Sequence, residues 1–312
     1  MSESRPAAHQ RADTLPPAGF VLLAALSLFW GLNWPAMKLA LTEIPVWPLR
    51  SLCLIGGGVA LLAISAASGR SLRIATGEFR PLVICTLFNV VGWQLFTGYG
   101  VSLMEAGRAS IIAFTMPVWA ALLGGFILGE RTPLRRWFAL GLGMSGLAVL
   151  MGPDLFKVGK SPLGALMMLG AAISWAIGTV LLKRTAWSLP TAALTGWQLM
   201  LAAVPITIGA VILGDAPDPS SLSPTAIGAT LYIILVPMIF CHWAWFKVVA
   251  LFPAAVAAIG TLAIPIVGVL SSALILGEAI GLREILALGL VSAALVMVLL
   301  LPALRPSGAR SR

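Results

Sequence analysis

Polar and aromatic side chains in the middle of long apolar segments are the residues of this sequence that could do chemistry. A polar group in such a segment is costly unless it meets a partner or a cavity. Aromatic walls with a few amide groups suit a small amphiphilic solute. We therefore predict a central binding cavity. The residues predicted to line it are Trp30, Asn33, Asn89, Trp93, Gln94, Tyr99, Trp175, Thr179, Gln198 and His242.

The spacing of these residues leaves two interpretations open. Trp30 and Asn33 are three residues apart and share a helix face, and the Pro35 that follows weakens the local backbone ladder. They could face a cavity or pack between helices. Asn89 and Gln94 cover more than one face, so both cannot line the cavity. We favour Gln94 because it falls on His242 when the two halves of the sequence are aligned at a shift of 148 residues. The alternative for each amide is an ordinary interhelical hydrogen bond.

His242 is the only histidine inside an apolar segment. An imidazole titrates near neutral pH, so this side chain could carry a proton. The alternative is a neutral residue that forms a hydrogen bond within the bundle.

Three basic residues lie near the outer membrane face in the predicted arrangement of the spans. They are Lys38, Arg50 and Arg108. They could attract a carboxylate, or their side chains could snorkel toward lipid headgroups. Pro117 and Pro265 interrupt two segments, and we predict that they mark gating hinges.

The sequence holds no motif for catalysis or for a bound metal or cofactor. It has no His-Glu-x-x-His, no Walker motif and no Asp or Glu near the middle of a predicted span. Coupling through a buried carboxylate is therefore not expected, which leaves facilitated diffusion or coupling through His242. Cys53, Cys85 and Cys241 lie in apolar segments and read as small buried residues.

The composition requires these residues to be positioned by membrane helices. Hydrophobic residues make up 59% of the 312 residues and charged residues 10%, with a mean hydropathy of +1.00. Soluble domains carry about 25% charged residues. A soluble enzyme, a secreted disulfide scaffold and a disordered chain are excluded. The net charge of +9 comes from Lys and Arg at the ends of apolar runs, which indicates membrane orientation rather than a nucleic-acid partner.

Ten segments are long and apolar enough to be spans, at about 20 residues each. They cover residues 18–41, 45–67, 79–99, 107–128, 132–151, 162–183, 190–213, 224–249, 253–276 and 280–301. Most Lys and Arg residues fall on one side if both termini are cytoplasmic, so we predict that orientation.

An internal repeat divides the chain into two halves. Residues 106–151 match residues 254–299 at a constant shift of 148, with 16 of 46 positions identical. The identities include Pro117 with Pro265 and the turn that ends at Glu130 with the turn that ends at Glu278. Gln94 falls on His242 at the same shift. Five spans per half place the second half in the membrane upside down, as in many transporters.

We therefore predict five regions. These are an N-terminal cytoplasmic tail (1–17), a first five-helix repeat (18–151), an outer loop (152–161), a second, inverted repeat (162–301) and a C-terminal cytoplasmic tail (302–312). The predicted fold class is an all-α integral membrane protein with ten transmembrane helices around a central cavity.

The pattern resembles the drug/metabolite transporter superfamily in its ten-helix EamA-type branch, nearest to the bacterial YddG-type amino-acid exporters. The residues that carry the resemblance are Phe29 to Asn33, Leu49 with Arg50, and Pro117 with Leu128 to Glu130, together with their second-half equivalents. It implies a monomeric basket of helices in the bacterial inner membrane that exports amino acids or similar metabolites, or lets them diffuse, by alternating access. The alternative within the superfamily is the efflux of drugs or other metabolites.

Overall fold

The computed structural model describes residues 17–127, 134–151, 160–213, 217–251 and 254–297. All its regular structure is helical within these ranges, as the composition predicts. Seven helical stretches are long and apolar enough to cross a membrane, and two shorter apolar helices accompany them. The predicted loop at 152–161 and both predicted tails lie almost wholly outside the described residues.

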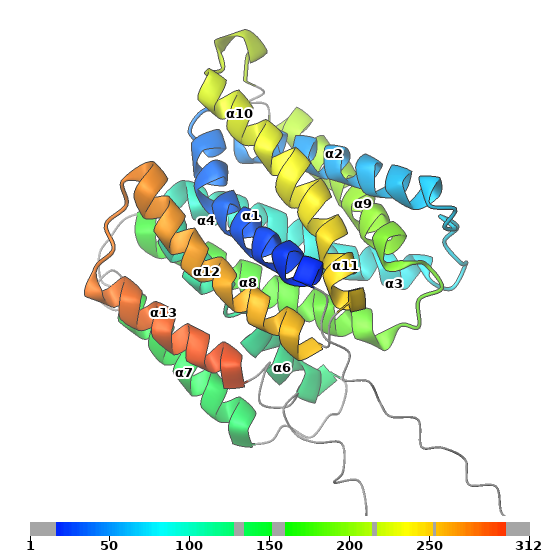
Figure 1. The fold of residues 1–312 in the computed structure, drawn as a ribbon. Helices are drawn as coiled ribbons and strands as arrows, with labels where there is room; N and C mark the ends of the chain where they lie inside the picture. The colour runs from blue at the N-terminus through cyan, green and yellow to red at the C-terminus, as the bar shows by residue number, and fades with distance from the viewer. Residues whose placement is uncertain (1–16, 128–133, 152–159, 214–216, 252–253, 298–312) are drawn as a thin grey trace, which may run out of the picture.

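The helices follow one another with short connections (Figure 1). They are α1 (Pro17–Leu41), α2 (Val46–Ala67), α3 (Phe79–Thr86), η1 (Leu87–Gly92), α4 (Trp93–Leu103), α5 (Ala106–Ala113), α6 (Met116–Ile127), α7 (Leu134–Met151), α8 (Lys160–Arg184), α9 (Thr191–Ile212), η2 (Pro219–Ser221), α10 (Pro224–Ile233), η3 (Ile234–Cys241), α11 (His242–Leu251), α12 (Ala254–Leu276) and α13 (Leu282–Leu295).

Four helix pairs form the most extensive contacts of the bundle. Helix α2 packs along α9, α1 along α12, α4 along α8, and α13 along α7. The main core lies among α1, α5, α8 and α12, where Met37, Ile111, Ile112, Met168 and Ile264 are buried. Each pair joins helices from different halves of the chain, so neither half folds around its own core alone.

Two of the long helical stretches contain a π-helical segment. Helices α3, η1 and α4 form one continuous stretch, and α10, η3 and α11 form the other. The shift of 148 places residues 87–92 of η1 at 235–240, inside η3. A π-helical segment interrupts the regular ladder and is frequent at functional sites. Pro237 lies inside η3, whereas nothing comparable marks η1 in the sequence.

The predicted span at 107–128 corresponds to the candidate membrane span Ala106–Ile127, and the structure divides this span into α5 and α6. The break falls at Phe114 and Thr115, just before Pro117. Pro117 then lies in the first turn of α6, where its missing N–H costs nothing. Its repeat equivalent, Pro265, lies inside the continuous helix α12.

The two ends of the bundle differ in their side chains. One end, which we call the basic end, exposes Arg70, Arg73, Arg80, Lys183, Arg184 and Lys247. At the opposite end, α4 and α12 finish and α5 and α13 begin. We call it the capped end, for contacts described below.

Close helix contact at Gly178 gives a test of this packing. A Cβ atom on Gly178 would lie 2.5 Å from the backbone nitrogen of Asn89, whereas one on Gly141 would meet nothing within 4 Å. We expect Gly178→Ala to lower the thermal unfolding midpoint, at a cost of about 1–3 kcal/mol. Gly141→Ala should leave the midpoint unchanged or raise it, since Ala favours helix by up to about 1 kcal/mol. Equal effects of the two substitutions would contradict this helix arrangement.

Candidate functional site

Arg50 is a buried cation without an anion. It lies in α2 with 2% of its surface exposed. Its Nη2 atom donates to Thr97 Oγ1 at 3.0 Å and contacts the sulfur of Met37, and its Nε atom has no partner. No Asp or Glu in the described ranges forms an ion pair with it. A buried guanidinium is stable only with good compensation, so this arrangement is suited to receive an anionic group.

Two further buried polar atoms on neighbouring elements lack a partner. They are Asn33 Oδ1 in α1 and Gln198 Nε2 in α9. Leaving a buried donor or acceptor unpaired costs about 1–3 kcal/mol, so such atoms often mark a ligand site. Other buried atoms of this kind are found on Ser65, Glu78, Thr86 and Ser272. The predicted cavity residues Asn33 and Gln198 thus share an unmet hydrogen-bonding capacity with Arg50.

The structure joins three of the predicted cavity residues between η1 and α8. Asn89 Nδ2 donates to the Trp175 carbonyl oxygen and to Thr179 Oγ1, both at 3.2 Å. Helix α8 also donates from Ser174 Oγ to the Phe88 carbonyl oxygen at 2.7 Å. The Asn89 amide therefore forms an interhelical hydrogen bond, which was one of its two interpretations. It fixes α8 against the π-helical segment.

Trp30 and His242 meet across α1 and α11. Their rings are 5.8 Å apart in an edge-to-face arrangement, and Trp30 also lies 6.1 Å from Trp245. His242 Nδ1 lies 2.9 Å from the carbonyl oxygen of Pro237, which lies inside η3. This contact suits a protonated Nδ1, which would leave Nε2 as the atom that can take up a proton. The sequence did not indicate the part played by Trp245.

The remaining predicted cavity residues divide between the interior and the surface. Gln94 is 3% exposed, and Trp93 packs against the main core. Tyr99 is 38% exposed, and its hydroxyl accepts a hydrogen bond from Trp47 Nε1 at 2.8 Å. The structure therefore places Tyr99 on the bundle surface beside Trp47, apart from the other residues. This pair is typical of the aromatic residues found at membrane interfaces.

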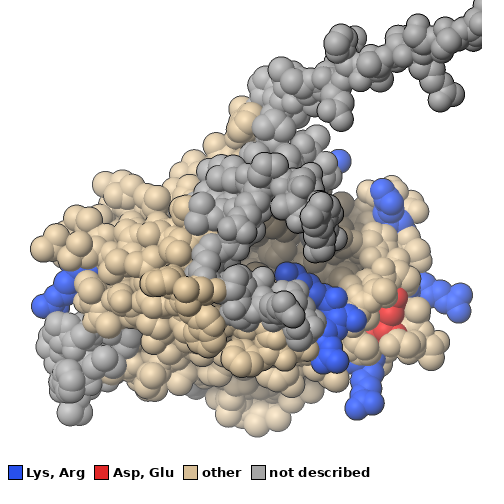
Figure 2. All heavy atoms as spheres, turned by 90° about the horizontal axis from the view of Figure 1, so that it is seen from below, with Lys and Arg blue, Asp and Glu red and all other residues tan. Residues whose placement is uncertain are grey.

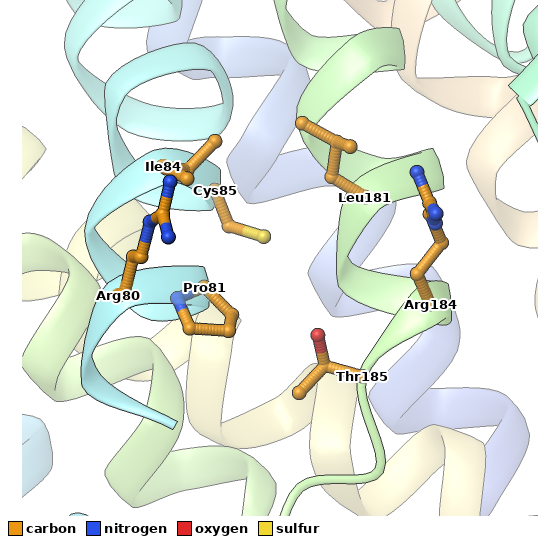
Figure 3. A pocket seen from close by; sticks show the side chains of 7 residues that line it. All are labelled: Arg80, Pro81, Ile84, Cys85, Leu181, Arg184 and Thr185. Atoms are coloured by element: carbon orange, nitrogen blue, oxygen red, sulfur yellow. The ribbon is translucent and has the colours of Figure 1, made fainter. Parts of the chain in front are cut away.

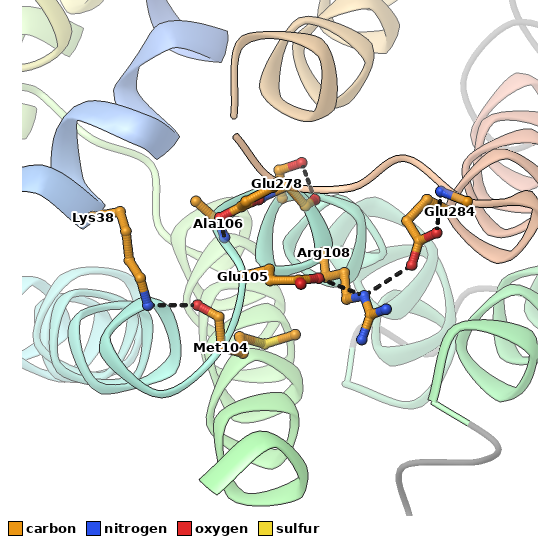
Figure 4. A network of polar contacts seen from close by, with 10 residues as sticks. Lys38, Met104, Glu105, Ala106, Arg108, Glu278 and Glu284 are labelled. Atoms are coloured by element: carbon orange, nitrogen blue, oxygen red, sulfur yellow. Dashed lines mark hydrogen bonds and ion pairs between the residues drawn. The ribbon is translucent and has the colours of Figure 1, made fainter. Parts of the chain in front are cut away.

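The three residues of the predicted basic cluster, Lys38, Arg50 and Arg108, have different surroundings. Figure 4 shows Lys38 and Arg108. Lys38 Nζ donates to the carbonyl oxygens of Val101 and Met104 at 2.8 Å, where it caps the end of α4. Arg108 Nε pairs with Glu105 at 2.8 Å and with Glu284 at 2.9 Å. Lys38 and Arg108 therefore have partners within the chain. Arg50 contacts Thr97 and Met37, and of the three it is the one whose described contacts include neither a carboxylate nor a backbone carbonyl oxygen.

Glu278 closes the capped end. Its carboxylate accepts hydrogen bonds from the backbone N–H groups of Ala106 at 2.7 Å and Gly107 at 2.8 Å (Figure 4). These are the first residues of α5, so the anion satisfies free donors at the positive end of the helix dipole. The contact ties the turn after α12 to α5. The sequence marked Glu278 only as part of the repeat, and Glu130 in the first half lies outside the described residues.

Within the described ranges, no three His, Cys, Asp or Glu side chains lie together so that they could hold a metal ion. The three cysteines are free and buried.

Comparison with known proteins gives a consistent result. The model of the EamA-like transporter family matches residues 17–152 and 162–300. The uncharacterized transporter YoaV of Bacillus subtilis is 26% identical over 85% of this chain and 90% of its own length. The probable amino-acid metabolite efflux pump of Escherichia coli is 25% identical over 83% of this chain and 87% of its own length. A crystal structure with 21% identity and a TM-score of 0.61 covers 90% of this chain and 96% of the other, and shows the same fold.

The Glu278 contact predicts a difference between two glutamates of the capped end. We expect Glu278→Gln to lower the free energy of unfolding by about 1–2 kcal/mol, because the charge at the α5 N-terminus is lost. The thermal unfolding midpoint should fall accordingly. Glu105→Gln should cost less, since the Glu105 side chain is 43% exposed and exposed pairs contribute about 0–1 kcal/mol. The ordering is contradicted if Glu105→Gln is the more destabilising change in detergent melts.

Proposed function

Because the chain belongs to the EamA-like transporter family, we propose that it moves amino acids or similar small metabolites across the bacterial inner membrane by alternating access. Members of this family are transporters, and the chain is a membrane transporter rather than an enzyme. Two of its relatives carry the name probable amino-acid metabolite efflux pump, which supports the substrate class.

The proposal rests mainly on the burial of Arg50 and on its unpartnered Nε atom. A guanidinium with a free donor binds a carboxylate strongly, because both groups are charged and their geometries match. Gln198 Nε2 supplies a second free donor, and Asn33 Oδ1 supplies a free acceptor. A donor at Arg50 and an acceptor at Asn33 on the neighbouring helix α1 suit a zwitterion, with its carboxylate toward Arg50 and its ammonium group toward Asn33. Gln198, opposite Gly57 and Gly58 of α2, lies about two helical turns from Arg50. A cationic drug would gain nothing from an uncompensated buried cation.

Aromatic side chains supply the apolar part of the proposed site. Trp30 and Trp93 pack against the main core. Trp175 lies in α8, and its backbone carbonyl oxygen accepts a hydrogen bond from Asn89 Nδ2. Rigid aromatic surfaces bind the apolar part of a small solute at low entropic cost. His242, in contact with Trp30, is the group we propose for any proton that moves with the substrate.

We further propose ten spans in two inverted halves, with both termini in the cytoplasm. Three observations support this arrangement. The family model matches the two halves separately, the π-helical segments lie at equivalent positions, and the basic residues gather at one end. Under this topology the basic end faces the cytoplasm. The Glu278 contact then closes the outer side, and substrate enters from the cytoplasm.

Uptake by liposomes that contain the purified protein tests the proposal. A panel of labelled amino acids is offered without an ion gradient, and we expect uptake of several of them. Arg50→Gln should reduce uptake by about tenfold to a hundredfold, the equivalent of one charged hydrogen bond. Arg50→Lys, which keeps the charge, should retain more activity. The matched control is Arg283→Gln, which removes an exposed arginine at the start of α13 and should transport normally.

Two outcomes would contradict the proposal. If no amino acid enters with or without a pH gradient, the substrate class is wrong, and drugs and other metabolites should be tested next. If Arg50→Gln folds and transports like the parent protein, Arg50 does not bind the substrate.

A further inference from the structure

A groove lies between α3 and α8 at the basic end. Figure 3 shows the side chains that line it, and its volume is about 240 Å³. Arg80, Ile84 and Cys85 line it from α3, and Leu181, Arg184 and Thr185 line it from α8 and the residue that follows. None of these residues belongs to the proposed substrate site, so the groove calls for a separate explanation.

Two arginines stand on opposite sides of the groove without an acidic partner. Arg80 and Arg184 are both exposed, and no ion pair involves them in the part of the chain that the structure describes. The carboxylate closest in sequence, Glu78, is buried and accepts a hydrogen bond from the Ser188 backbone N–H. Figure 2 shows Lys and Arg side chains gathered toward one side of the lower face, with few acidic side chains among them. The groove therefore favours an anion.

The walls of the groove between the arginines are apolar and open toward the bundle surface. Ile84 is 39% exposed, and its neighbours Val83 and Leu87 are 42% and 54% exposed. In a membrane protein such a surface contacts acyl chains. Cys85, by contrast, is 2% exposed and lies toward α8. The occupant must therefore carry an anionic head and an apolar tail.

We propose that this groove binds one anionic phospholipid. The phosphate lies between the guanidinium groups of Arg80 and Arg184, which can each donate two parallel hydrogen bonds to phosphate oxygens. One acyl chain runs along Ile84 and Leu181. Basic pockets between membrane helices bind anionic headgroups in this way. A free phosphate ion would use the arginines but not the apolar wall.

Native mass spectrometry of the purified full-length protein tests this proposal. The protein is titrated with phosphatidylglycerol and, separately, with phosphatidylcholine. We expect one phosphatidylglycerol to bind in preference to phosphatidylcholine. The Arg80→Gln/Arg184→Gln double variant should bind phosphatidylglycerol roughly 30-fold more weakly, from about 1 kcal/mol for each lost basic group. Leu181→Trp, which fills the apolar wall and keeps the charge, should also weaken binding.

The matched control is the double variant Arg70→Gln/Lys183→Gln. It removes two exposed basic residues of the same end that do not line the groove. We expect this control to bind phosphatidylglycerol like the parent protein. If both double variants lose phosphatidylglycerol binding equally, the binding depends on general surface charge, and the proposed lipid site is overturned. Displacement of the lipid by glycerol phosphate at equal concentration would show that the apolar wall is not used, and would also overturn it. A thermal melt of each variant confirms that it is folded.

Discussion

The absence of water from the membrane interior is the constraint on which this structure depends. Each buried polar group must find its partner within the chain, because lipid offers none. Most of the charged groups described here obey this rule. Lys38 caps the end of α4, Glu278 caps the start of α5, and Arg108 pairs with two glutamates. Arg50 is more deeply buried than these three residues and forms no ion pair with an Asp or Glu in the described ranges, so we propose that it meets a charge from outside the chain.

The polar contacts also make the two ends of the bundle unlike. At the capped end, Glu278 and Lys38 tie α12 to α5 and α1 to α4, and these contacts join residues far apart in the chain. At the basic end, exposed lysines and arginines dominate. This asymmetry is consistent with the proposed closure of the capped end. The Glu278 contact uses only a side chain and two backbone N–H groups, so it can be broken and remade without unfolding a helix.

The sequence predicted the helices well and their partners poorly. Apolar runs of about 20 residues indicate membrane helices whatever their tertiary setting, which is why most of the predicted segments correspond to described helices. The π-helical segments and the break at Phe114 depend on backbone hydrogen bonding that hydropathy does not record. The same limit applies to side chains. Nothing near Arg108 or Lys38 in the sequence shows that Glu284 pairs with one and that carbonyl groups of α4 bind the other. Tyr99 lies on the same predicted segment as Asn89 and Gln94, yet its hydroxyl contacts Trp47 on the bundle surface.

Binding of an amino acid and of its carboxamide, compared in the parent protein and in Arg50→Gln, tests the central claim most directly. The two ligands differ only in the charge of the group that Arg50 is proposed to hold. The account predicts that the parent protein binds the carboxylate at least about tenfold more tightly than the carboxamide, and that Arg50→Gln loses this preference while it still binds the carboxamide. An equal preference in both proteins would show that the carboxylate is recognised elsewhere and would contradict the account.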